Sequence, residues 1–90
     1  MFSARMYTIK MENKNFKKIE DLLVEILKCP RDLLKDENGP NQISNWDSIT
    51  HMEIISKVEE AFGIQLDIDE INQIDTFGAL KNVLKKHGKL

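Results

Sequence analysis

Apolar residues recur at helical spacing in the middle of this chain. The steps are of three or four residues, which places the side chains on one stripe of a helix about four turns long. The stripe consists of Ile49, Met52, Ile55, Val58 and Phe62, supplemented by Ile54 and Ala61. Gly63 follows directly, and glycine suits the left-handed conformation that ends many helices. The segment predicts an amphipathic helix that ends near Phe62.

Two further segments show the same periodicity. One runs roughly from Asn15 to Lys28 and is closed by Pro30, which disfavours helical backbone in the residue before it. The other begins at Thr76, with four apolar residues on its inner face: Phe77, Leu80, Val83 and Leu84. Between the central segment and the one that begins at Thr76, apolar and polar residues alternate from Ile64 to Ile68. This run has no partner strand, so we expect an extended connection and a short helix near 69–74. The predicted fold is all-α, with three main helices and one short one.

A long connection separates the first two helices. From Pro30 to Trp46 the chain shows no sustained periodicity, and about 17 residues is long for a loop in a compact domain. Such loops are usually functional or contain a short element of their own. We expect one helical turn at Asp32-Leu33-Leu34 that pins the loop to the core.

Length and composition exclude several classes of protein. With 90 residues there is room for one domain and one modest core, which argues against a self-sufficient enzyme. No apolar run approaches the roughly 20 residues of a membrane span, and Met1 to Lys10 has no secretory hydrophobic block. The single cysteine, Cys29, excludes an internal disulfide framework and has no metal-binding partner in the sequence. We expect a soluble cytoplasmic protein.

Charge is distributed unevenly along the chain. Residues 41–75 contain eight acidic residues and one lysine, a net charge of −7, whereas four lysines and no acids follow Asp75. The acidic middle would steer basic partners and repel nucleic acid. Asp67, Asp69 and Glu70 do not match the spacing of a calcium loop, so we interpret them as a solvated acidic surface.

The stretch Trp46-Asp47-Ser48-Ile49 lies at the head of the central helix. Serine and aspartate are common helix caps, because their side-chain oxygens accept hydrogen bonds from unpaired backbone N–H groups. A helix start also favours anions, so a serine there could hold a phosphate. Thr50 and Glu53 also fit a capping box, which would move the helix start by two residues.

Two neighbours of Ser48 have alternative interpretations. Trp46 either covers one end of the core or packs beside a tethered group or a partner. His51 lies one turn along the same helix, without the independent approach that a general base for Ser48 needs, so we expect it to face solvent or a partner. A small hydrolase using Ser48 and His51 is a minor alternative, and ester turnover lost in His51→Ala would reveal it.

Taken together, Asp47-Ser48-Ile49, the amphipathic helix after it, Phe62-Gly63-Ile64 and the late Thr76 helix resemble the acyl carrier protein family. The resemblance spans roughly Asn15 to Leu84. The family motif is Asp-Ser-Leu, and here Ile49 replaces the leucine while Asn45-Trp46 replaces the usual glycine-x. The implied fold is an all-α, four-helix acyl-carrier-like bundle with a long first loop.

The resemblance implies a carrier that is not an enzyme. Ser48 would be the attachment site of 4′-phosphopantetheine, installed from coenzyme A by a phosphopantetheinyl transferase, and acyl groups would travel as thioesters on its thiol. Asp47 would help to hold Mg²⁺ during attachment, with no stable metal site. Partner enzymes would be an acyl- or aminoacyl-activating enzyme and a downstream acyltransferase or ketosynthase. Their candidate contacts are Trp46, Ile49, Met52, Glu53, Glu59 and Glu60, although the spacing alone favours Met52 as a core residue.

The predicted domain organisation is a flexible N-terminal extension at 1–12, a carrier domain at 13–87 and a tail at 88–90, working as a monomer. The variant motif and the lysine-rich ends favour a discrete carrier in a specialised biosynthetic pathway. The main alternative is an unmodified helical interaction module, in which Ser48 only caps a helix and the acidic face binds a basic partner.

Overall fold

The fold is all-α, as the periodicity predicts. The computed structural model describes the backbone of residues 2–90 and the side chains of residues 14–90. Within that part of the chain there are no strands, and the elements are α1 (Phe2–Leu27), the 3-10 turn η1 (Arg31–Leu33), α2 (Ser48–Phe62), α3 (Ile68–Gln73) and α4 (Phe77–Lys86). No helix among the described residues has the length and apolar character needed to cross a membrane.

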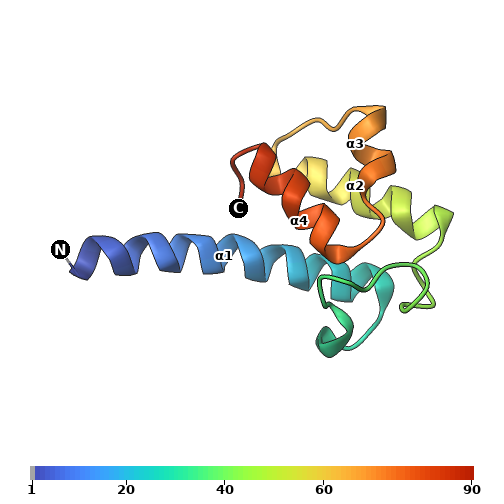
Figure 1. The fold of residues 1–90 in the computed structure, drawn as a ribbon, viewed down its shortest axis with the longest axis horizontal. Helices are drawn as coiled ribbons and strands as arrows, with labels where there is room; N and C mark the ends of the chain where they lie inside the picture. Colours follow the sequence, from blue (N-terminus) through green and yellow to red (C-terminus); the bar gives the residue numbers. More distant parts are fainter. Residues whose placement is uncertain (1) are drawn as a thin grey trace.

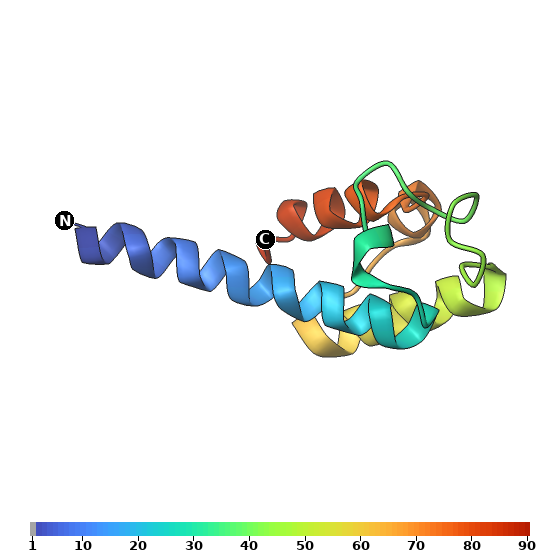
Figure 2. The ribbon, with the colours of Figure 1, turned by 90° about the horizontal axis from the view of Figure 1, so that it is seen from below.

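The first helix is longer than its sequence pattern predicts. It begins at Phe2 rather than near Asn15, and its N-terminal half projects from the bundle while its C-terminal half packs against α2 (Figures 1 and 2). Residues 2–14 contain no glycine or proline, so a helix formed by the packed half can continue through them, one hydrogen bond per added residue. The boundaries of the N-terminal extension, the domain and the tail remain predictions.

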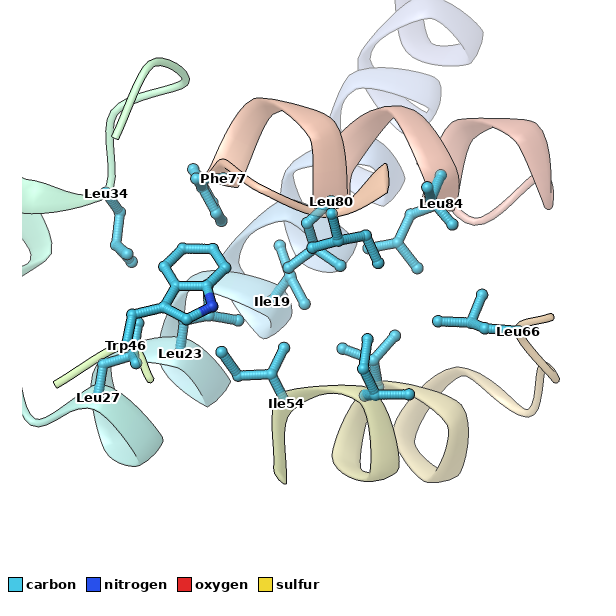
Figure 3. Close-up of a cluster of buried hydrophobic side chains, with 14 of the residues drawn as sticks. Ile19, Leu23, Leu27, Leu34, Trp46, Ile54, Leu66, Phe77, Leu80 and Leu84 are labelled. Atoms are coloured by element: carbon cyan, nitrogen blue, oxygen red, sulfur yellow. The ribbon is translucent and has the colours of Figure 1, made fainter. Parts of the chain in front are cut away.

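The core lies between the C-terminal half of α1, α2 and α4 (Figure 3). The predicted inner face of α4 is confirmed, because all four of its apolar residues are buried. On α2 the prediction is only partly right: Ile54, Ile55, Val58 and Phe62 are buried, but Ile49 and Met52 are 74% and 52% exposed. The start of α2 extends beyond the end of α1, so α1 does not cover this end of the helix (Figures 1 and 2).

The long loop is tied to the core and to the start of α4. The predicted helical turn is present as η1, and Leu34, Ile43 and Trp46 are buried in the core. Where the loop passes α4, the N–H of Gly78 donates to the carbonyl of Asp36 at 3.0 Å. A Cβ at Gly78 would lie 2.9 Å from that same carbonyl oxygen, so only glycine allows this approach. The loop therefore delivers Trp46 and Asp47 to a fixed place at the start of α2.

Glu70 corrects the prediction of a fully solvated acidic surface, because it is buried. Its carboxylate accepts a hydrogen bond from the backbone N–H of Asp67 and lies 2.8 Å from Nε2 of His87, at the end of α4. The Asp67 N–H bond and the His87 contact outweigh the effect of burial and lower the pKa of Glu70. This contact fastens the short helix α3 to α4.

Candidate functional site

The start of α2 resolves the question of which residue caps the helix. Asp47 is the N-cap: its side chain accepts hydrogen bonds from the backbone N–H groups of Ile49 and Thr50, at 2.9 and 3.0 Å. Thr50 closes the capping box, since its hydroxyl accepts from the backbone N–H of Asp47 at 2.9 Å. The alternative start at Thr50 is therefore wrong, and Ser48 is the first helical residue.

Ser48 takes no part in capping the helix. Its side chain is exposed, and its hydroxyl has no hydrogen-bond partner among the described residues. It stands at the N-terminal end of a 15-residue helix, where the helix dipole favours negative charge. The N–H groups of Ile49 and Thr50 are already used by Asp47, so a phosphate on Ser48 would project into solvent rather than sit in a nest of backbone donors.

The carboxylate of Asp47 is held in its charged form. The hydrogen bond from the backbone N–H of Thr50, supported by that of Ile49, lowers the pKa of Asp47. Both backbone bonds go to a single oxygen, Oδ1. Within the described part of the chain Oδ2 has no partner, so one hard, charged oxygen is available beside Ser48.

An open groove of about 540 Å³ adjoins the serine. It lies between the start of α2, helix α3, the long loop and the connection to α4. Apolar and polar residues line it in equal number: Pro40, Trp46, Asp47, Ser48, His51, Met52, Ile71, Asn72, Ile74 and Asp75. The residues that line the groove come from segments that are far apart in the sequence.

Trp46 and His51 lie differently from what their sequence positions suggest. Trp46 is only 2% exposed, which agrees with a role in covering the core and does not fit direct contact with a partner. His51 is half-buried rather than solvent-facing: it accepts from Nε1 of Trp46 at 3.1 Å, and its Nε2 lies 3.1 Å from the carbonyl oxygen of Ile71. The periodicity of α2 carries no signal for the contact with Ile71, which lies 20 residues further along the chain.

The other candidate contact residues are spread along α2. Ile49, Met52 and Glu53 are exposed and lie within the first two turns, close to Ser48. Glu60 is exposed near the far end of the helix, and Glu59 there is half-buried because its carboxylate accepts the backbone N–H of Leu66 at 2.8 Å. Ile68, at the start of α3, is 73% exposed and was not among the predicted residues.

The all-α bundle is the fold expected of an acyl-carrier-like protein. Residues 17–84 match the family model described as "Phosphopantetheine attachment site". The "Acyl carrier protein" of Lactobacillus johnsonii is 31% identical over 77 residues, which cover 84% of this chain and 95% of the relative. The "Acyl carrier protein" of Lactobacillus acidophilus is 29% identical over 76 residues, with the same coverage of both chains. The chain therefore belongs to the acyl carrier protein family.

Membership settles the class of activity. The chain is a carrier and not an enzyme, and its cofactor is covalently bound 4′-phosphopantetheine. Family members are modified by a phosphopantetheinyl transferase and work with enzymes that handle acyl groups. The resemblance inferred from the sequence is thereby confirmed at the level of family, fold and cofactor.

Proposed function

We propose that Ser48 carries the phosphopantetheine arm and that the chain shuttles acyl or aminoacyl thioesters between enzymes on it. The observation that carries the proposal is that residues other than Ser48 cap the start of α2. Asp47 and Thr50 satisfy the helix end, and the Ser48 hydroxyl is left exposed and unbonded within the described residues. The arm would supply a thiol for thioesters, and the chain's own residues would present and orient its attachment point.

The experiment that tests carrier function uses the wild-type chain, a broad-specificity phosphopantetheinyl transferase and an acyl-coenzyme A. We expect intact-mass measurement to show the gain of one acyl-phosphopantetheinyl group. Hydroxylamine, which cleaves thioesters, should then remove the acyl group and leave the arm. A chain that gains no mass would instead support the alternative, an unmodified interaction module.

Asp47 is proposed to bind Mg²⁺ while the arm is being attached. Its lowered pKa keeps it charged at neutral pH, and Oδ2 is not engaged by the cap. A hard carboxylate oxygen is a suitable ligand for Mg²⁺ in a site shared with substrate phosphates.

Asp47→Asn separates the capping role from the charge. Asparagine caps helices about as well as aspartate, so we expect the melting temperature to change by less than about 4 °C. The rate of arm attachment should fall by roughly tenfold or more, and the Mg²⁺ concentration needed for half-maximal rate should rise. An unchanged Mg²⁺ dependence in a folded Asp47→Asn variant would exclude the proposed role.

Partner enzymes are proposed to dock on the exposed face of α2. Ile49 and Met52 would supply apolar contact next to the arm. Glu53 and Glu60 would attract basic patches. Glu59 would contribute less, because its carboxylate is already bonded to the backbone of Leu66. Electrostatic recognition speeds encounter without requiring tight binding, which suits a shuttle. The partners would be an acyl- or aminoacyl-activating enzyme and a downstream acyltransferase or ketosynthase.

We further propose that the chain serves a specialised biosynthetic pathway in the cytoplasm. The support is the variant motif, in which Trp46 and Ile49 flank the Asp-Ser pair, together with the four lysines after Asp75. The buried Trp46 is a structural element of this variant and not only a change of surface.

A further inference from the structure

His51 connects two segments that border the groove beside Ser48. The indole Nε1 of Trp46 donates to Nδ1 of His51 at 3.1 Å, and Nε2 of His51 lies 3.1 Å from the carbonyl oxygen of Ile71. The indole and imidazole rings stack, with centroids 6.3 Å apart and planes inclined by 24°. In the described part of the chain, the bond to Ile71 is the only hydrogen bond between α2 and α3.

These two bonds define the protonation state of the imidazole. The indole N–H can only donate, so Nδ1 of His51 must be the acceptor, and the Ile71 carbonyl can only accept, so Nε2 must carry the proton. Only the neutral ring with its proton on Nε2 satisfies both partners. A second proton on Nδ1 would face the indole N–H and break the bond to Trp46.

The segment before Ser48 is also held by two hydrogen bonds of Asn45. The side-chain amide of Asn45 donates to the carbonyl of Leu27 at 2.7 Å, and the hydroxyl of Thr50 donates to the carbonyl of Asn45 at 2.6 Å. Trp46 follows Asn45 and is buried. His51 thus fixes the side chain that lies two residues before the serine, and it fixes α3 on the opposite side of the groove.

We propose that neutral His51 is a positioning residue for the attachment reaction at Ser48. Through Trp46 and Ile71 it holds the Trp46–Ser48 segment and α3 in one arrangement, in which the serine hydroxyl is presented to the transferase. This inference rests on the proposed function of Ser48. His51 does not itself touch the reacting atoms in this role, and acts through the groups it holds.

Two variants of His51 separate positioning from general stability. In His51→Gln the amide offers an acceptor for Trp46 and a donor for Ile71 but does not titrate, whereas His51→Leu offers neither. Attachment kinetics are measured with coenzyme A and a broad-specificity transferase, well below the melting temperature of each variant. For His51→Leu we expect kcat to fall about tenfold and KM to stay within about twofold, because the exposed face of α2 is unchanged. His51→Gln should stay within about twofold of wild type in both constants at neutral pH.

Trp46 is the only tryptophan in the chain, so its fluorescence reports the same contact. At neutral pH the emission of His51→Leu should differ from that of wild type, and that of His51→Gln should stay close to it, because the glutamine amide still accepts from the indole N–H. If His51→Leu is only less stable but has wild-type kcat, or if a folded His51→Gln variant loses about tenfold in kcat, the proposal is wrong. A wild-type chain that is never modified would instead overturn the role of Ser48, and with it the positioning role. The two variants are independent tests. If His51→Leu fails to fold, the comparison of His51→Gln with wild type still decides.

Discussion

Replacing Ser48 with alanine is expected to abolish arm attachment completely while leaving the fold intact. The hydroxyl is the proposed point at which the phosphodiester forms, and alanine has no nucleophilic atom. The cap of α2 is provided by Asp47 and Thr50, which the substitution does not touch. Alanine is also a favourable residue within a helix. Intact mass after incubation with coenzyme A and the transferase measures attachment, and thermal unfolding measures the fold.

Ser56→Ala is the matched control for this experiment. Ser56 is an exposed serine on the same helix, two turns further along, so its loss should leave attachment unchanged. We expect both alanine variants to unfold within about 0.5 kcal/mol of wild type, as surface substitutions usually do. Attachment that survives Ser48→Ala at the wild-type level would remove Ser48 from its proposed role.

The largest effect on stability is expected from Phe77→Ala. The Phe77 side chain is fully buried at the start of α4, and its ring meets that of Phe16 edge to face, with centroids 6.3 Å apart. Deleting a buried phenylalanine ring removes apolar burial and leaves a cavity, which typically costs about 3–5 kcal/mol. Because domains are typically stable by only about 5–15 kcal/mol, this is a large fraction of the total. Urea unfolding, followed by circular dichroism, measures the loss.

Ile68→Ala provides the comparison for Phe77→Ala. Ile68 is the first residue of α3 and is 73% exposed, so its truncation should change the free energy of unfolding by less than about 0.5 kcal/mol. A Phe77→Ala variant that loses less than about 1 kcal/mol would contradict the packing described for α4. A similar loss in both variants would contradict the assignment of the core.

Local patterns sufficed for the parts of the fold that depend on neighbours in sequence. The inner face of α4, its start near Thr76 and the left-handed end of α2 at Gly63 are all present as predicted. Each depends on periodicity or on the conformational preference of one residue. The exposure of Ile49 and Met52 could not be predicted in this way, because it depends on where α1 ends relative to α2 in space.

Contacts between distant segments explain the remaining differences at the site. His51 bonds to Ile71, and Glu70 is buried against His87, and both are pairs that no spacing within one helix reveals. The sequence did allow Ser48 to be selected as the candidate attachment residue. It did not separate the cap from the serine, because Asp47, Ser48 and Thr50 are all common at helix starts and only the hydrogen bonds distinguish them.

The central claim is that Ser48 bears the arm, and peptide mapping of the modified wild-type chain tests it most directly. The chain is loaded by the transferase from coenzyme A, digested, and sequenced by tandem mass spectrometry to locate the phosphopantetheinyl group. We predict that the group is found on Ser48 alone and on one residue per chain. A group located on Ser44, on Ser56 or on any other residue would contradict the account.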